Sequence, residues 1–310
     1  RQGARRNDDW DAFEILIRAF QERLPEVFDA EAAYYVSWLI DERVARGRLS
    51  DLPPLAKEMA AHAGDAIDTF SFTLEALAYH CDLTTLVEVM RIAWSTVKGD
   101  ADILEWAAGE FVDRAFRYEM LRHCGQAESP DPDDPGLTER LEFYVDDVRQ
   151  DSVTGFILNV TGQAAPITLD DRWRGDACAR LCLQFLGHLI REQGVAPGKA
   201  DLACENLGRY LLERSRGRLE RSPPLYDPGR RPSKRKGKAR RAQRRTVHLL
   251  CPDAGTLEPY LAGQLHFFSA HYYAVAATME CIPAWLRFLE SHQLIDAQEH
   301  QGTLRDLAGM

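Results

Sequence analysis

The chain has 310 residues, of which 45% are hydrophobic and 28% are charged, and its formal net charge is -10. This is the composition of an ordinary globular protein, and it excludes a wholly disordered chain or a fibrous repeat. The negative charge argues against a protein that coats nucleic acid with its whole surface, and no apolar run is long enough for a membrane-spanning helix.

Apolar residues recur with the period of a helix along almost the whole chain. The first segment places five of them at the spacing of one helix face: Phe13, Leu16, Ile17, Phe20 and Leu24. Similar patterns, with Gly and Pro as breaks, predict helices over residues 10–24, 29–47, 55–63, 66–80, 84–97, 101–123, 137–149, 169–193 and 199–217.

The alternation typical of strands is limited to residues 153–161 and 246–251. We therefore predict an all-α fold of stacked helical hairpins, which is either α-solenoid-like or a multi-helix bundle. The expected regions are an N-terminal helical region (1–125), a second helical region packed on it (137–217), a basic flexible segment (218–248) and a C-terminal helical unit (249–310).

Three segments share a loose pattern of helix, break and helix. They begin at Trp38-Leu39, Phe185-Leu186 and Trp285-Leu286, and they end at Leu55, Leu202 and Leu304. The spacing suits an α-hairpin repeat in which each hairpin covers its neighbour. The alternative is that unrelated amphipathic helix pairs produce the same match.

Seven cysteines are spread thinly through the chain: Cys81, Cys124, Cys178, Cys182, Cys204, Cys251 and Cys281. An odd, sparse set does not resemble the disulfide framework of a small secreted protein. No signal peptide is visible in the sequence, so we expect reduced thiols and a cytoplasmic location.

The strongest local anomaly is a basic segment with ten positive charges and no acid between residues 229 and 246. Its charged residues are Arg230, Arg231, Lys234, Arg235, Lys236, Lys238, Arg240, Arg241, Arg244 and Arg245. Such a segment is too polar and self-repelling to join a core. It could bind phosphates, dock on an acidic protein surface, carry a transport signal or serve only as a solvated linker.

Nucleotide-binding, metallohydrolase and di-iron motifs are missing from the sequence. Cys178 and Cys182 lie four residues apart, as two zinc ligands on one helix face would, but their apolar neighbours favour a core role. Glu119 and His123 share a face in the same way, and we expect them to be structural. We also expect Glu110 with Arg114, and Asp113 with Arg117, to form surface ion pairs within one helix.

One weak enzymatic alternative remains among the histidines. Arg287 with His292, and Arg117 with His123, have the spacing found in some helical ribonucleases. His266 and His271 lie among aromatic residues that are typical of a packed helix. We assign no catalytic residue, metal or cofactor.

The sequence therefore favours a binding or scaffold protein whose helical array engages a protein partner, with the basic segment adding electrostatic attachment. Nucleic-acid association through that segment is the second hypothesis, and a ribonuclease is the third. An oligomer also suits the pattern, because the exposed ends of a helical stack need a cap.

Overall fold

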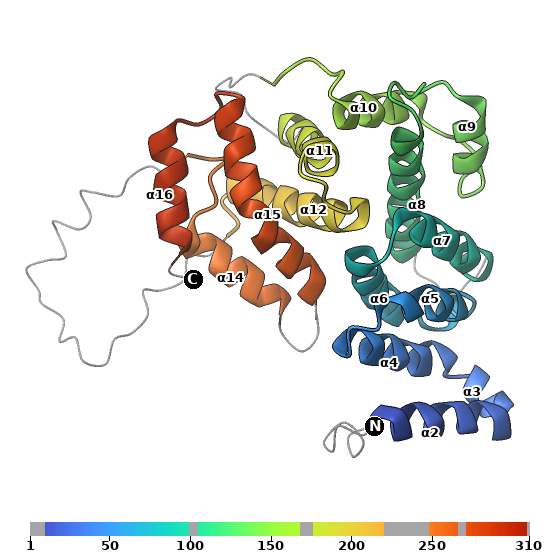
Figure 1. Cartoon of the computed structure of the whole chain (residues 1–310). Helices are drawn as coiled ribbons and strands as arrows, with labels where there is room; N and C mark the ends of the chain where they lie inside the picture. Colours follow the sequence, from blue (N-terminus) through green and yellow to red (C-terminus); the bar gives the residue numbers. More distant parts are fainter. Residues whose placement is uncertain (1–9, 99–104, 168–175, 220–247, 266–270, 309–310) are drawn as a thin grey trace, which may run out of the picture.

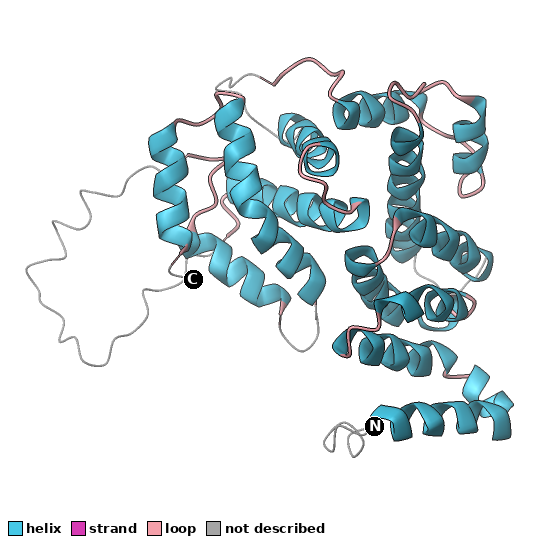
Figure 2. Ribbon diagram, viewed as in Figure 1, coloured by secondary structure: helices cyan, strands magenta, loops and turns pink. Residues whose placement is uncertain are grey.

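The computed structural model describes residues 10–98, 105–167, 176–219, 248–265 and 271–308. These residues form fourteen α-helices and two short 3-10 turns, and no strand occurs among them (Figures 1 and 2). The predicted all-α fold is confirmed.

The first helices stack one above another along one side of the molecule (Figure 1). They are α2 (Trp10–Arg23), α3 (Pro25–Asp29), α4 (Ala32–Ala45), α5 (Leu52–Ala60), α6 (Ile67–His80), α7 (Leu83–Val97) and α8 (Glu105–Gln126). Helices α2 and α3 form the last layer at the bottom of the view, and α2 packs against α3 and α4.

The chain then turns across the top of the view and continues beside the first stack. Its helices are α9 (Pro135–Glu142), α10 (Gln150–Thr161), α11 (Asp176–Arg191), α12 (Pro197–Ser215), α14 (Ala254–Gln264), α15 (Tyr272–Ser291) and α16 (Ala297–Leu307). Helix α12 is central, because it packs against α6, α11 and α15.

Local sequence signals fix several helix ends. The Asp82 carboxylate accepts a hydrogen bond from the backbone of Thr85 at the start of α7, and Asp296 and Glu299 form a capping box at the start of α16. Such caps satisfy backbone N–H groups that have no partner inside the helix. Proline occupies the first helical position of α9 and of α12, where its missing N–H costs nothing.

The predicted strand alternative at residues 153–161 is wrong, because these residues belong to α10. Val153, Phe156, Ile157 and Val160 are buried at helical spacing, and Gly162 ends the helix in the left-handed conformation with a φ of 77°. The β-branched composition suggested a strand, whereas the spacing of the buried residues follows the helix. Residues 248–251 are a turn, and the two residues before them lie outside the described part of the chain.

One predicted helix covers too much of the chain. The helix expected over residues 137–149 is α9, which begins at Pro135 and ends at Glu142, and irregular residues separate it from α10. The Asp134 carboxylate caps the start of α9 by accepting a hydrogen bond from Gly136 N at 3.1 Å. The earlier start therefore has a local cause in an N-cap aspartate followed by proline.

The buried apolar side chains form one continuous cluster that runs from Phe13 to Ile295. Trp285 lies at its centre in the second half, in ring contact with Phe185 and Phe288, and donates a hydrogen bond to the carbonyl of Leu250 at 2.9 Å. The boundaries of the predicted regions stay predictions, but their described helices share this core.

A polar contact also joins three helices from distant parts of the sequence. The Tyr79 hydroxyl of α6 donates a hydrogen bond to Glu280 of α15 at 2.5 Å, and Lys199 of α12 forms an ion pair with the same carboxylate. The Lys199 ammonium also lies 4.3 Å from the centre of the Tyr79 ring. This cation–π contact helps to hold the C-terminal helices on the first stack.

Each of the three segments that suggested a repeat is a pair of packed consecutive helices: α4 with α5, α11 with α12, and α15 with α16. None of the helices in the described ranges combines the length and the apolar character that crossing a membrane requires.

Candidate functional site

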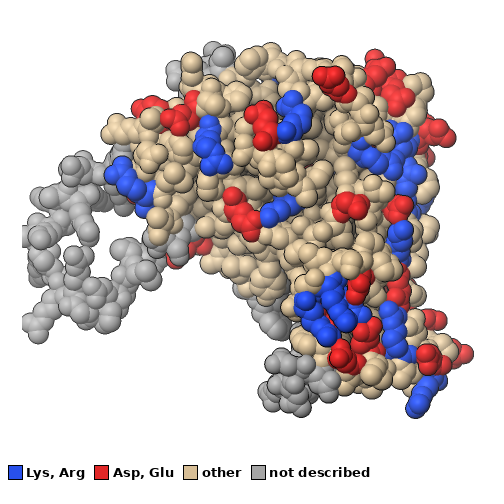
Figure 3. All heavy atoms as spheres, in the orientation of Figure 1, with Lys and Arg blue, Asp and Glu red and all other residues tan. Residues whose placement is uncertain are grey.

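The ten basic residues of the segment between 229 and 246 lie outside the described residues. Their role therefore stays a prediction from the sequence. On the face shown in Figure 3, acidic and basic side chains are interspersed, and several of both signs gather over the N-terminal helices.

The structure does not bring Arg117 and His123 together as an acid/base pair. Six residues separate them on α8, so their side chains point about 120° apart. Arg117 binds Asp201 of α12, whereas His123 Nε2 lies 2.8 Å from the carbonyl oxygen of Asp131. Glu119 binds three arginines instead of His123: Arg91, Arg122 and Arg140.

The second proposed pair, Arg287 and His292, lies at the end of α15. The Arg287 guanidinium lies 3.5 Å from the side-chain oxygen of Gln193, and His292 Nδ1 lies 2.8 Å from the carbonyl oxygen of Phe288. The first contact joins α15 to Gln193, and the second lies within α15. Neither contact brings a second acid or base of the described chain to His292.

The two cysteines weighed as zinc ligands do not belong to a larger set of metal-ligating side chains among the described residues. Cys178 and Cys182 are buried on α11, and all seven cysteines are free thiols in the structure. No group of three or more metal-ligating side chains occurs within the described ranges. His266 lies outside those ranges, and His271 binds Glu75 at 2.6 Å.

The described part of the chain contains a charged cleft of about 450 Å³. Helices α6, α8 and α12 form its walls, and the end of α14 and the start of α15 complete it. A cavity of this size accommodates a small molecule or a few side chains of a peptide. Its charged lining residues are Asp68, Glu75, Glu110, Asp113, Arg114, Arg117, Glu205, Arg209 and His271.

The floor of the cleft is a pair of ionic contacts between α8 and α12. Arg117 donates to Asp201 Oδ1, with a distance of 2.8 Å from Nε, and the Asp201 side chain is 1% exposed. Burial alone would lower the pKa of Arg117, but the attraction of Asp201 and Glu205 outweighs it and raises that pKa. Burial raises the pKa of Asp201, an effect that Arg117 opposes. The guanidinium therefore stays charged and keeps its bond to the carboxylate.

Glu205 holds two further arginines next to this pair. Its carboxylate lies 3.4 Å from Arg114 of α8 and 2.8 Å from Arg209 of α12. Burial alone would raise the pKa of Glu205, but the arginines Arg114, Arg117 and Arg209 lower it. Each of the three cleft arginines thus has a carboxylate of α12 as its partner, and two of them share Glu205.

The predicted ion pairs within α8 do not form, because its arginines turn toward α12. Glu110 and Asp113 are exposed at the cleft, and neither has an ion pair with a described residue. Asp68 of α6 is exposed in the same way on the facing wall. The cleft therefore presents three carboxylates that have no ion-pair partner among the described residues.

An aromatic ring lies beside these carboxylates. Phe72 follows Asp68 by one helical turn on α6, and its side chain is 38% exposed. Its ring centre lies 5.5 Å from that of His271, which in turn contacts Glu75. Exposed rings close to carboxylates attract ammonium and guanidinium groups, because the ring face and the carboxylates both carry negative charge.

A network of amides and hydroxyls closes the other end of the cleft. Asn206 donates to Thr278 at 2.9 Å and accepts from Gln264 at 2.7 Å and from Tyr260 at 3.1 Å. The side-chain oxygen of Gln264 is inaccessible to solvent and accepts no hydrogen bond in the described structure. This network joins α12 to α14 and α15.

The cleft is not apparent from the sequence, which predicts that Glu110 and Asp113 pair with arginines of their own helix and indicates no role for Asp68 or Phe72. One signal was present, since Asp201 and Glu205 lie four residues apart on one face of a helix rich in apolar residues. Two acids on a buried helix face indicate cations on the helix opposite.

No protein-family model, curated protein or solved structure matches the chain. The function must therefore be inferred from the chain's own residues.

Proposed function

We propose that the protein is a binding protein whose charged cleft holds a lysine- or arginine-rich segment of a protein partner. The observation that carries this proposal is the presence, at one cavity, of an exposed aromatic ring and three exposed carboxylates that have no ion-pair partner among the described residues. A cationic side chain would lie between Glu110 and Asp113 of α8 and Asp68 of α6, with its alkyl part or guanidinium plane against Phe72.

The pairing of the cleft arginines favours a cation over an anion. Arg114 and Arg209 share Glu205, and Arg117 binds Asp201, so each guanidinium described at the cleft already has a carboxylate partner. Opposite charges across an interface also raise the rate of association and select against wrong partners. The all-helical frame positions the two walls, since α8 and α12 are tied together by ionic contacts.

The first prediction concerns the exposed acids. The double substitution Glu110→Gln and Asp113→Asn should weaken binding of a fluorescein-labelled arginine-rich peptide by about tenfold. Phe72→Ala should weaken it roughly two- to fivefold, because only the cation–π contact is lost. Fluorescence anisotropy measures both effects, and rising salt should reduce the affinity of the native protein.

A matched control separates the cleft from net charge. Glu139→Gln with Glu142→Gln removes the same charge from exposed positions of α9, away from the cleft, and should leave the affinity unchanged. Equal weakening by both double variants would assign the binding to the overall negative charge. Absence of binding by the native protein, with an uncharged peptide as reference, would overturn the proposal.

A second candidate function is nucleic-acid association, which the ten positive charges between residues 229 and 246 favour. Replacing Arg230, Arg231, Lys234, Arg235, Lys236, Lys238, Arg240, Arg241, Arg244 and Arg245 with glutamine should abolish binding to a labelled single-stranded RNA and to duplex DNA. In the native protein, affinity should fall steeply with salt, since each phosphate contact releases counterions. Unchanged binding by the glutamine variant would contradict this function.

We also propose a reducing compartment, the cytoplasm, as the location of the protein. Free thiols at all seven cysteines support this proposal, since a secreted protein of this size commonly pairs such residues. Fractionation of cells with an antibody to the chain tests it.

A further inference from the structure

The outer side of α2 carries an apolar stripe whose two large side chains are exposed. Ile15 is 68% exposed and Leu16 is 61% exposed. The sequence places Leu16 on the same face as the buried residues Phe13 and Ile17, but in the structure it lies outside the core. Ala12 and the half-buried Ala19 lie on the same helix face, one turn on either side.

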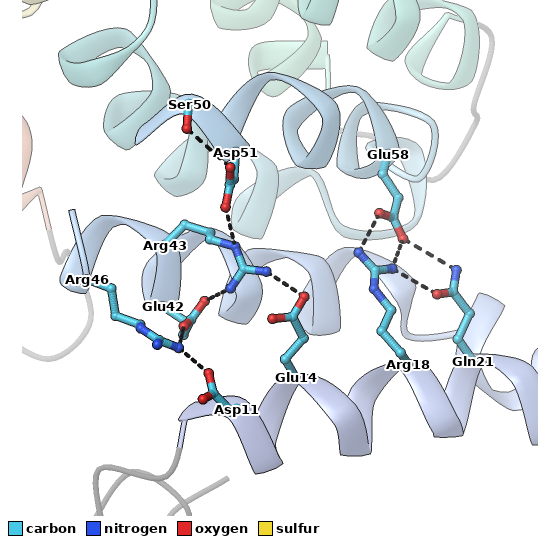
Figure 4. A network of polar contacts seen from close by, with 10 residues as sticks. All are labelled: Asp11, Glu14, Arg18, Gln21, Glu42, Arg43, Arg46, Ser50, Asp51 and Glu58. Carbon is cyan, nitrogen blue, oxygen red and sulfur yellow. Dashed lines mark hydrogen bonds and ion pairs between the residues drawn. The ribbon is translucent and has the colours of Figure 1, made fainter. Parts of the chain in front are cut away.

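The inner side of α2 is firmly attached, so the stripe cannot turn inward. Three ion pairs hold this side (Figure 4). Glu14 binds Arg43 of α4, and Asp11 binds Arg46 at the end of α4. Arg18 binds Glu58 of α5 at 2.8 Å. Phe13 and Ile17 are buried on this side. The structure thus fixes which face of α2 points away from the stack.

The stripe is symmetric in residue size along the helix. Reading Ala12, Ile15, Leu16 and Ala19 in either direction gives a small residue, two large residues and a small residue. If two α2 helices lie antiparallel, Ile15 of each copy faces Leu16 of the other, and Ala12 faces Ala19. A two-fold dimer requires this kind of self-complementary surface, because both copies contribute the same patch.

The dipoles of the helices favour the same orientation. Antiparallel packing brings the positive N-terminal end of one α2 beside the negative C-terminal end of the other, whereas a parallel arrangement would align like ends. Asp11 does not contribute, because it is bound to Arg46 on the inner side of the helix.

Two further apolar residues of this end layer are exposed. Leu24, just before α3, and Val27 of α3 are each 51% exposed in the same end layer of the stack. Exposed apolar residues that occur singly are common, whereas a contiguous group marks an interaction surface. A helical stack also needs a cover on its terminal apolar face.

We propose that α2 is a homodimer interface, in which a second copy of this chain packs antiparallel on the stripe formed by Ala12, Ile15, Leu16 and Ala19. The two N-terminal stacks would then join end to end through α2. This interface is separate from the charged cleft, so it does not depend on the proposed peptide binding.

Sedimentation equilibrium over a concentration series tests the proposal. The native full chain should rise toward twice its monomer mass, and Ile15→Lys and Leu16→Glu should each stay monomeric with an unchanged melting temperature. Met279→Lys, at a 37% exposed position of α15, is the control and should dimerise like the native chain. A native chain that stays monomeric throughout, or substituted chains that dimerise as well as the native one, would overturn the proposal.

The antiparallel register has its own test. In a mixture of the Ile15→Lys and Leu16→Glu chains, a heterodimer gains a Lys–Glu pair at one contact and keeps the Ile15–Leu16 contact at the other. The mixture should therefore recover dimer that neither variant forms alone. Failure of the mixture to dimerise would contradict the proposed pairing.

Discussion

Replacing Arg117 with leucine is expected to lower the free energy of unfolding by about 3 kcal/mol at neutral pH. The substitution leaves the Asp201 carboxylate, whose side chain is 1% exposed, without the cation that binds it. Removing one partner of a buried pair costs more than removing both, because the remaining charge stays desolvated. Urea denaturation followed by circular dichroism measures the change.

The loss of stability in Arg117→Leu should depend on pH, because it arises from the buried Asp201 carboxylate. Without Arg117, burial raises the pKa of Asp201 with only the attraction of Arg114 left to oppose it. A raised pKa means that the folded state holds its proton more tightly than the unfolded state, so the penalty is largest at neutral pH and shrinks as the pH falls. The difference in the free energy of unfolding between the native protein and Arg117→Leu should therefore decrease in mild acid.

A second substitution distinguishes charge burial from lost packing. Adding Asp201→Asn to Arg117→Leu removes the unpaired charge and should recover part of the lost free energy at neutral pH. The double variant should also lose the pH dependence. If Arg117→Leu were as stable as the native protein, the Arg117–Asp201 ion pair between α8 and α12 would contribute nothing to the stability of the fold.

The helical architecture could be predicted because the spacing of apolar residues is a local property. Even α10, which was mistaken for a strand, carries this spacing in Val153, Phe156, Ile157 and Val160. The β-branched residues of this segment favour a strand, whereas the spacing of its apolar residues is that of a helix. Intrinsic preferences are weak, and packing overrides them when the buried residues lie on one helix face.

The cleft could not be predicted because its residues acquire their roles from helices far apart in the sequence. Arg114 and Arg117 have acids four residues earlier, which is a sound basis for predicting pairs within α8. In the structure, the buried carboxylate of Asp201 and the half-buried carboxylate of Glu205 hold these arginines instead. A desolvated carboxylate gains more from a cation than an exposed one does, and the local pattern cannot show which helix lies opposite.

The sequence of α2 likewise does not show which of its apolar residues the core covers. Its apolar residues form a helix-like pattern that includes Leu16, yet the structure covers only the side of Phe13 and Ile17. Periodicity identifies apolar positions, but it does not tell a face buried in the chain's own core from one available to another molecule. The exposed fraction of Leu16 provides that information.

Gly187→Ala is expected to destabilise the fold by about 3 kcal/mol, at the upper end of the cost of overfilling a packed site. A Cβ atom at Gly187 would lie 1.9 Å from the carbonyl oxygen of Val160. Because this neighbour is backbone, relief requires α10 and α11 to separate, and their packed side chains would lose contact. The midpoint of urea unfolding measures the loss.

Gly155→Ala on α10 is the matched control for this prediction. A Cβ atom there would meet nothing within 4 Å, so alanine should raise stability by up to about 1 kcal/mol through its better helix propensity. The two substitutions add the same methyl group to two packed helices, and their opposite signs would isolate the effect of the close approach. If Gly187→Ala stabilised the protein as Gly155→Ala does, α10 and α11 would have room to separate, and the tight crossing would not constrain the fold.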